Sequence, residues 1–527
     1  MEDRAEAQPF PQSSIEGHRA RFPALANKAY FNYGAEGPLP SESLEAMVES
    51  YRRLQQWGPF STETHVWLQE ELQQTRAVLA GLLGAPANSL LLTENISLAC
   101  NVVLWGFDWT PGDHLLLSDC ENPGIVAAAR EVARRNRLEL SFCRLSAARD
   151  SDEAVEEAVR ALRPRTRMVL LSHVLWNTGL LLNLNHLSRA LEGQPARPRL
   201  LIDGAQSVGV MPVEVEECGA DAYAFTGQKW LCGPSGLAGL YLVPDLAHRL
   251  RPTFTGWRSL DDRPGRLAGQ DAISESVPEA TRESHAGERD SRSARREDRH
   301  STPRDLSALS VAELHARRFP EPGAGGRRAG ADPFREAGSP QPEGRGIPPC
   351  GGNQDREGGA NPTVPGRNLA SPAREESPPT KGAWPLRHAK SRARDDVRRF
   401  EIGSSAYPLC AGLRRSLKIH RSWGTPSQRY QRILKLAAYL HEGLQDIRRR
   451  HGADRLQTLL PRPPQSGIVS FQLPDAVHTD LVFLLESEGV MAKVMPGPEC
   501  LRVCVHYFTT REELNRLLAQ LEAFLTL

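Results

Sequence analysis

Short aliphatic runs alternate with amphipathic stretches over the first half of the chain. The runs are almost continuous in Leu, Val and Ile, whereas residues 125–136 and 151–163 repeat apolar positions at helical spacing. Nearly continuous aliphatic strands that alternate with helices are typical of a mostly parallel sheet covered on both faces, which predicts an α/β domain. The expected strands are residues 89–93, 114–118, 138–143, 167–173, 199–203 and 222–226.

The last hundred residues have a different pattern. A helical period covers residues 430–450 and 511–525, and β-type runs occupy 468–473 and 501–507. This mixture predicts a smaller C-terminal α+β domain.

A long segment between these two parts is poor in aliphatic residues. Residues 263–395 are rich in Arg, Gly, Pro, Ser and Glu and carry no sustained period. Such a stretch buries too little apolar surface to offset its ordering entropy, so we expect a disordered, low-complexity insertion with at most a short helix near 306–318.

The expected organisation follows from these boundaries. It comprises an N-terminal segment (1–20), a large domain (21–262), the insertion (263–395), a return to the large domain (396–424) and a small C-terminal domain (425–527).

Composition and charge exclude several functional classes. The chain has 527 residues and a net charge of +1, which argues against a nucleic-acid partner. The start of the chain is charged and no apolar run reaches about 18 residues, so we expect neither a secretion signal nor a membrane span. Nine cysteines without paired CxxC spacing argue against a zinc site and a disulfide framework, and favour a reducing, cytoplasmic setting.

Polar residues follow the predicted strands, at the edge where parallel sheets bind ligands. They include residues 93–97, 119–122, 203–206 and 226–229, and His173. Each has an ordinary structural alternative, such as a helix cap for Asn or Ser, or a core position for His173. Their convergence at one edge favours a ligand site.

An acid on one strand end and a lysine after the next match the needs of pyridoxal phosphate. A lysine amine binds the aldehyde of this cofactor, and a carboxylate keeps its ring nitrogen protonated. Asp203 and Lys229 suit these two roles. Residues 95–97 and Thr226 can supply hydroxyls and backbone N–H groups for the phosphate.

Several longer motifs resemble a known family. DGAQSVGVMPVEVEECGADAYAFTGQKWLCGPSGLAGLYLV (203–243) resembles the cofactor-lysine region of class V aminotransferase-fold enzymes. Six further motifs, listed at the end of this paragraph, are similar to those of cyanobacterial L-cysteine/cystine carbon-sulfur lyases. The resemblance implies the fold-type I architecture of pyridoxal phosphate-dependent transferases, a homodimer, and β-elimination from cystine or cysteine. These motifs are RFPALANKAYFNYGAEGPLP (21–40), DCENPGI (119–125), LSHVLWNTG (171–179), FTGWRS (254–259), SSAYPLCAGL (404–413) and PECLRVCVHY (498–507).

The resemblance also implies individual roles. Lys229 would be the catalytic lysine that binds the cofactor, Asp203 the partner of the ring nitrogen and Gln206 the partner of the ring hydroxyl. Arg502 would bind the substrate carboxylate through its guanidinium fork, although a surface ion pair is its ordinary alternative. The remaining implied residues are Ser97 and Thr226 at the phosphate, Ser404 at the phosphate of the neighbouring subunit, and Trp257 beside the substrate.

Three positions depart from the family pattern. Asn122 stands where a histidine usually stacks on the ring, and Gln228 precedes the lysine where the family has histidine. Lys493 replaces a second arginine on the substrate side, which keeps the charge but loses the fork. The persulfide-forming cysteine loop of the desulfurases is not visible, and Cys500 has the ordinary role of a packed core residue.

The sequence therefore predicts a pyridoxal phosphate-dependent carbon-sulfur lyase that forms persulfide or sulfide, pyruvate and ammonia. One alternative is an epimerase, aminotransferase or desulfurase-like enzyme of the same fold. Another is a catalytically weakened cofactor-binding protein whose insertion serves interactions.

Overall fold

The structure is a computed structural model that describes residues 14–260, 394, 396–403, 405–474 and 477–526. All of these residues fall within one compact unit of the chain. Apart from Arg394, the expected insertion and its helix at 306–318 lie outside the described residues, as does Ser404.

A seven-stranded sheet forms the centre of the large domain. Its strand order is β2-β8-β7-β6-β5-β3-β4, and the five strands from β7 to β4 pair in parallel, whereas β8 is antiparallel to both neighbours. The ends of β2 and of the five parallel strands therefore lie at one edge. The strands are β2 (Leu90–Thr93), β3 (His114–Ser118), β4 (Glu139–Cys143), β5 (Thr166–Ser172), β6 (Arg199–Asp203), β7 (Ala222–Thr226) and β8 (Ala238–Leu242).

Both faces of this sheet are buried, because successive aliphatic residues point to opposite sides. Leu116, Val169 and Leu171 pack in one core cluster, and Leu115 and Leu117 in the other. Helices α4 (Ile96–Gly106), α5 (Pro123–Asn136) and α8 (Pro244–Arg249) contribute to the second cluster. The first cluster includes residues of α3 (Thr62–Leu82), α6 (Ser151–Arg160), α7 (Leu184–Glu192) and α10 (Tyr407–Trp423).

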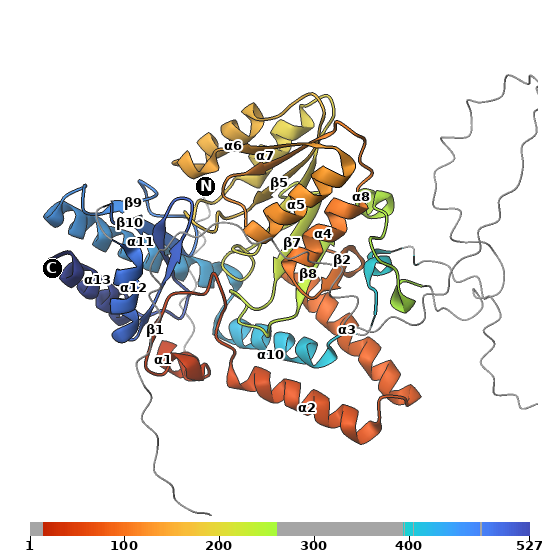
Figure 1. Cartoon of the computed structure of the whole chain (residues 1–527). Coiled ribbons are helices and arrows are strands. Elements are labelled where there is room, and N and C mark those ends of the chain that lie inside the picture. Colours follow the sequence, from red (N-terminus) through yellow and green to blue (C-terminus); the bar gives the residue numbers. More distant parts are fainter. Residues whose placement is uncertain (1–13, 261–393, 395, 404, 475–476, 527) are drawn as a thin grey trace, which may run out of the picture. The chain divides into compact units, whose positions relative to one another are not determined.

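The C-terminal part has its own sheet and core, and its blue elements form a separate group in Figure 1. The antiparallel order is β12-β13-β10-β9, and a capping box of Thr425 and Gln428 with Pro426 starts its longest helix. The elements are α11 (Pro426–His451), β9 (Gln457–Thr458), β10 (Ile468–Gln472), α12 (His478–Ser487), β12 (Lys493–Met495), β13 (Cys500–Cys504) and α13 (Arg511–Thr526).

Remaining elements connect the two parts. Strand β1 (Ala29–Tyr30) pairs in parallel with β11 (Val490–Met491), which joins the start of the chain to its C-terminal part. Helix α2 (Ser41–Trp57) packs along α10, as Figure 1 shows. A short helix, α1 (Ile15–Arg19), precedes them, and the 3-10 helices are Pro23–Leu25, Ala87–Ser89, Leu145–Ala147, Trp257–Ser259 and Val397–Phe400.

The predicted fold class is confirmed. The six predicted strands of the large sheet form with bounds that differ by at most one residue, and the C-terminal helices and strands also form. Strand β8 was not predicted, because its sequence AGLYL begins with two residues of low β-propensity. No helix in the described ranges is long and apolar enough to cross a membrane.

Candidate active site

The polar edge of the large sheet brings several predicted residues together. Ser172 and Asp203 are register partners at the ends of β5 and β6, and Thr226 ends β7. His173, one residue further along, is a satisfied core residue, because its Nδ1 lies 2.7 Å from the Tyr223 hydroxyl. Burial lowers the pKa of His173 to about 4, so the ring is neutral at physiological pH.

Asp203 is a buried carboxyl close to a lysine. Its Oδ1 accepts a hydrogen bond of 2.9 Å from the Ala205 N–H. Burial raises the pKa of Asp203, while the positive charge of Lys229 and the Ala205 N–H act against this rise. The side chain is thus placed to hold a proton on a basic nitrogen nearby.

Lys229 lies in a desolvated site between opposing charges. Desolvation lowers the pKa of its amine, Asp203 raises it, and Arg502 lowers it further. A lowered pKa increases the neutral fraction of the amine, which is the form that attacks a carbonyl or takes a proton.

The loop that carries Lys229 is fixed from several sides. The Gly37 N–H donates to the Gln228 carbonyl (2.7 Å), and His506 Nε2 donates to the Trp230 carbonyl (3.0 Å). His420 Nε2 donates to the Leu231 carbonyl at 2.9 Å. These bonds hold the lysine loop in one conformation.

Gln206 connects this loop to the N-terminal part of the chain. Its Oε1 accepts from Trp230 Nε1 and its Nε2 donates to the Gly34 carbonyl, both at 2.9 Å. A Cβ at position 34 would lie 2.9 Å from Cys504 Sγ and 3.0 Å from both Arg502 Cζ and Gln206 Oε1. Glycine at position 34 therefore allows these three side chains to converge.

Arg502 is a buried cation, 2% exposed, on strand β13. Its Nη1 donates to the Trp176 carbonyl (3.0 Å) and its Nη2 to Asn32 Oδ1 (3.1 Å), whereas Nε has no hydrogen-bond partner in the described structure. Within the described ranges, no Asp or Glu forms an ion pair with it. A buried charge without a counter-ion is costly, so the guanidinium suits an anionic ligand.

The start of helix α4 forms the opposite end of the site. Asn95 caps this helix by accepting from the Leu98 N–H, and Ser97 lies in its first turn. Free N–H groups and a hydroxyl at a helix start bind phosphate well. Thr226, buried at the end of β7, donates its hydroxyl to Gln228 Oε1.

Asn122 lies beside this phosphate-type site. A Cβ at Gly124 would lie 3.2 Å from Asn122 Oδ1 and 3.6 Å from Ser97 Oγ, so the two side chains flank the same glycine. Asn122 Oδ1 also caps helix α5 by accepting from the Gly124 N–H at 2.9 Å. The amide oxygen of Asn122 therefore serves as the N-terminal cap of helix α5.

Other predicted residues lie further out. Trp257 is 51% exposed on a 3-10 helix, with the Arg258 guanidinium 5.7 Å from its ring centroid. Lys493 is exposed, but it pairs with Arg502 across β12 and β13, which places both on the same side of that sheet. Cys500 is packed in the core, where burial raises its pKa to about 12.

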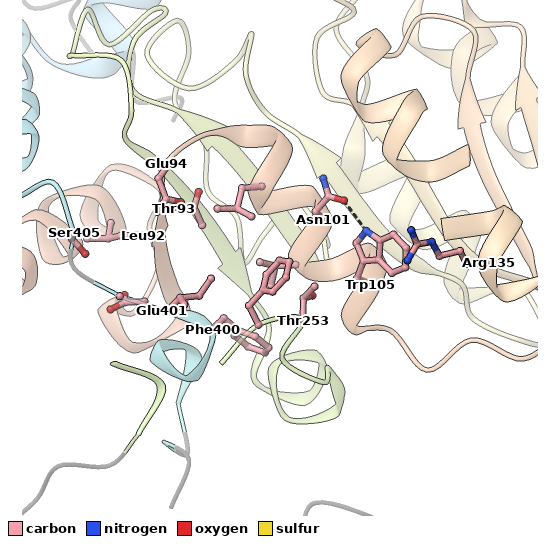
Figure 2. Close-up of a pocket in the computed structure, with 15 residues that line it drawn as sticks. Leu92, Thr93, Glu94, Asn101, Trp105, Arg135, Thr253, Phe400, Glu401 and Ser405 are labelled. Atoms are coloured by element: carbon pink, nitrogen blue, oxygen red, sulfur yellow. Dashed lines mark hydrogen bonds between the residues drawn. The ribbon is translucent and has the colours of Figure 1, made fainter. Parts of the chain in front are cut away.

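A separate cavity of about 480 Å³ lies beside helix α4. Leu98, Val102 and Trp105 line it from the helix, and Figure 2 shows the bond from Trp105 Nε1 to Asn101 Oδ1 (2.9 Å). The rest of the wall comes from segments 92–94, 253–254 and 400–403 and from Asn101, Arg135 and Ser405. Neither Lys229 nor Asp203 lines this cavity, but its lining residues 93, 94 and 98 flank the start of helix α4.

No individual role was predicted from the sequence for three residues of this region. Trp176 and Asn32 hold the Arg502 guanidinium, and Glu121 lies buried next to Ser172. Trp176 and Asn32 gave no separate signal within their motifs. Glu121 did give one, because it follows a predicted strand directly beside Asn122.

The donor set fits pyridoxal phosphate. The site holds an amine of lowered pKa, a buried carboxyl for a ring nitrogen, and a helix start with Ser97 for a phosphate. The unpaired Nε of Arg502 adds a place for a carboxylate beside the lysine.

Comparison with known proteins agrees with this chemistry. Residues 29–263 match the family model "Aminotransferase class-V". The chain is 33% identical over 231 residues to isopenicillin N epimerase of Streptomyces clavuligerus, which covers 43% of the chain and 56% of the relative. It is 25% identical over 273 residues to a cysteine desulfurase of Haloferax volcanii, covering 46% and 61%. The chain thus spans little more than half the length of these curated relatives.

Solved structures match over nearly the whole chain. The complex between the cystine C-S lyase C-DES and its reaction product cysteine persulfide is 29% identical, with a TM-score of 0.68 over 95% of this chain and 99% of that one. A C-DES mutant with glycine covalently linked to the PLP cofactor has the same identity and TM-score, over 96% and 98%. Residues 29–263 thus match the class V aminotransferase family over the large domain, and this match together with the PLP-linked neighbour structure implies pyridoxal 5'-phosphate as the cofactor.

Proposed function

We propose that this protein is a pyridoxal phosphate-dependent carbon-sulfur lyase acting on cystine or cysteine. The observation that carries this proposal is the buried Arg502, which has no anionic partner among the described residues and lies close enough to Lys229 to lower the pKa of the lysine amine. Such an arrangement suits an amino acid whose carboxylate binds Arg502 while its α-carbon faces the lysine. Similarity to the cystine C-S lyase C-DES supports a sulfur-containing substrate.

Each residue would have a distinct task. Lys229, Asp203 and Gln206 would hold the cofactor's aldehyde, ring nitrogen and ring hydroxyl, and Ser97 and Thr226 its phosphate. Bound pyridoxal phosphate supplies an electron-withdrawing ring that acidifies the hydrogen on the substrate α-carbon. The Lys229 amine would take this proton as general base, and its desolvated setting keeps more of the amine neutral.

The elimination would break the bond between Cβ and Sγ of the substrate. The sulfur leaves with its electron pair, as a persulfide from cystine or as sulfide from cysteine. Water then replaces nitrogen in the remaining three-carbon fragment, which gives pyruvate and ammonia. Arg502 would hold the carboxylate throughout, so that the α-hydrogen stays directed toward Lys229.

The thiols in the described part of the chain argue against a desulfurase. A persulfide-forming cysteine needs an accessible thiolate. The eight described cysteines are buried or partly buried, and desolvation raises the pKa of every one of them; they are Cys100, Cys120, Cys143, Cys218, Cys232, Cys410, Cys500 and Cys504.

An epimerase is the second candidate, and the 33% identity to isopenicillin N epimerase favours it. Both reactions begin with removal of the α-proton, and they differ in whether a β-substituent leaves or a proton returns. The product therefore separates them.

A homodimer is part of this proposal. Large apolar side chains remain exposed on the segments beside the cavity at α4, including Phe254 (57%), Trp257 (51%) and Ile402 (39%). A second copy of the chain would cover these residues and would bring its Ser404 toward the phosphate. Light scattering with Phe254→Ser and Ile402→Ser tests this, and we expect the substituted protein to shift toward monomer.

The test of the activity is a product analysis with the purified holoenzyme. Cystine, cysteine and alanine are supplied separately, and pyruvate, sulfide, persulfide and racemised amino acid are measured. The lyase proposal expects pyruvate with persulfide from cystine or sulfide from cysteine. Racemised product without pyruvate would replace it with the epimerase.

A further inference from the structure

A second buried carboxyl lies next to the cofactor side of the site. Glu121 follows strand β3 and is 5% exposed. Its Oε1 accepts from Ser118 Oγ (2.5 Å) and from the Ser172 N–H (3.1 Å), and its Oε2 accepts from Ser172 Oγ (2.7 Å). Within the described part of the chain, it forms no ion pair with Lys or Arg. In the described structure, a negative charge on Glu121 is therefore stabilised by two hydroxyl groups and one backbone N–H.

Strand order places this carboxyl close to Asp203. Strands β3, β5 and β6 are consecutive neighbours, and Ser172 at the end of β5 is the register partner of Asp203 on β6. Ser172 thus lies between the two carboxyls. Burial raises the pKa of Glu121 to about 7; the bonds from Ser118 and Ser172 oppose this rise, and the negative charge of Asp203 adds to it.

The other titratable groups around Glu121 leave this coupling in place. Cys100 on α4 and Cys143 on β4 are buried thiols whose raised pKa values keep them neutral, and so is the adjacent Cys120. Asp119 on the same loop is bonded to the N–H and hydroxyl of Ser146.

The neighbouring helix α5 adds charges on its exposed side. Arg130, Glu131 and Arg134 share a shallow surface hollow with Glu121. Glu131 binds Arg134 at 2.8 Å, and the Arg130 guanidinium lies 5.8 Å from the Phe142 ring centroid. None of these three hydrogen-bonds Glu121 in the described structure.

We propose that Glu121 is a positioning residue of the cofactor site, whose charge acts on Asp203 and so sets how firmly Asp203 holds a proton on the cofactor's ring nitrogen. When Glu121 is neutral, Asp203 is the one negative charge of the pair. When Glu121 ionises, a second negative charge adds to the field at the ring nitrogen and holds the proton more firmly. This inference rests on the cofactor and not on the identity of the substrate.

A spectroscopic titration without substrate tests the proposal. The absorbance of bound pyridoxal phosphate is recorded from pH 5.5 to 9 for the unaltered holoenzyme, Glu121→Gln and Glu131→Gln. Glu131→Gln removes the same charge from a partly exposed position of the adjacent helix, where the side chain is 39% exposed. We expect an inflection near pH 7 in the unaltered protein and in Glu131→Gln, and its loss in Glu121→Gln. A merely structural role for Glu121 would lower thermal stability but leave the inflection unchanged, and that result would overturn the proposal.

Two further variants keep the test decisive if Glu121→Gln does not fold. Ser172→Ala removes the hydroxyl that donates to Oε2 of the charged carboxylate, so the inflection should move to higher pH. Asp203→Asn removes the carboxylate through which Glu121 acts on the ring nitrogen, so the inflection near pH 7 should be lost. Inflections that stay in place in both variants would overturn the coupling. Cystine turnover is measured separately, so failure of the lyase proposal leaves this result interpretable.

Discussion

The two sides of the candidate site are built by different parts of the chain, and their charges are balanced differently. The cofactor side comes from the polar edge of the seven-stranded sheet, where Asp203 and Lys229 oppose each other's charge. The substrate side depends on Arg502 of the small C-terminal sheet, a buried cation that has no described carboxylate partner. Among the described residues, the cofactor side contains a carboxyl and an amine of opposite charge, whereas the substrate side contains a cation without a counter-ion.

This difference predicts which substitutions should affect the chemical step and which should affect substrate binding. Changes on the cofactor side should lower turnover, because they alter groups next to the reacting atoms. Substitutions of Arg502 should weaken substrate binding. They should also stabilise the protein without substrate, because they remove a buried charge.

The largest effect is expected from Asp203→Asn. The amide keeps the size of the side chain but cannot stabilise a protonated ring nitrogen by charge. We expect kcat to fall by about 10²- to 10⁴-fold while cofactor remains bound. Steady-state kinetics and the absorbance of bound cofactor measure this. An unchanged kcat would contradict the role of Asp203.

A smaller and opposite pair of effects is expected from Arg502→Met. Loss of charge-assisted bonds worth about 1.5–3 kcal/mol should lower kcat/KM by about 10- to 100-fold. The melting temperature without substrate should rise, because a hydrophobic side chain replaces an unpaired buried cation. Kinetics and calorimetry on the same preparation check both. Arg502→Lys is the matched control, which keeps the charge and loses the fork.

Lys493→Arg should strengthen substrate binding. Lys493 is exposed opposite Arg502, so a second guanidinium there would act through solvent-screened contacts. We expect KM for cystine to decrease by about two- to fivefold, within the range of exposed ion pairs, with kcat unchanged. A change in kcat alone would place Lys493 in the chemistry.

The buried His506, which donates a hydrogen bond to the lysine loop, predicts a pH effect on stability. Burial lowers the pKa of His506 to about 3, below its unfolded value near 6.5. Between these two pKa values the unfolded state binds a proton on His506 and the folded state does not. The contribution of His506 to the free energy of unfolding is therefore complete above pH 6.5 and is lost as the pH falls. His506→Gln should reduce the slope of unfolding free energy against pH between 6.5 and 5 by up to about 1.4 kcal/mol per unit. Urea titrations measure the slope, and an unchanged slope would contradict the prediction.

The smallest effect is expected from deleting residues 263–393 and joining the ends with a short linker. The flanks already bind each other, since the Arg394 N–H donates to the Ser259 carbonyl (2.9 Å) and Ser259 Oγ donates to the Glu401 carbonyl (2.7 Å). Loop-closure entropy changes by only about 0.6 kcal/mol per doubling of length. Cofactor content and melting temperature should stay close to those of the full chain, and aggregation of the shortened chain would show that this segment packs.

The sequence predicted six of the seven strands of the large sheet and placed the proposed cofactor residues at one edge of it. Continuous aliphatic strands have a strong local signal, and the polar residues that end them must share an edge, so the sequence alone pairs Asp203 with Lys229. The resemblance supplied Arg502, which strand pattern alone would assign to a surface ion pair. The structure shows it buried instead.

Long-range hydrogen bonds could not be predicted. The bonds from His506 and His420 to the lysine loop join residues far apart in the chain, and they leave no local pattern. Glu121 was adjacent to a chosen residue, but only the neighbouring strand end at Ser172 shows that it is buried and bonded.

Borohydride reduction followed by peptide mass mapping tests the central claim most directly. The account predicts that the yellow holoprotein yields one pyridoxyl-labelled peptide that contains Lys229, and that Lys229→Ala yields none. Labelling of another lysine, or an unlabelled protein that takes up no pyridoxal phosphate, would contradict the assignment of this site.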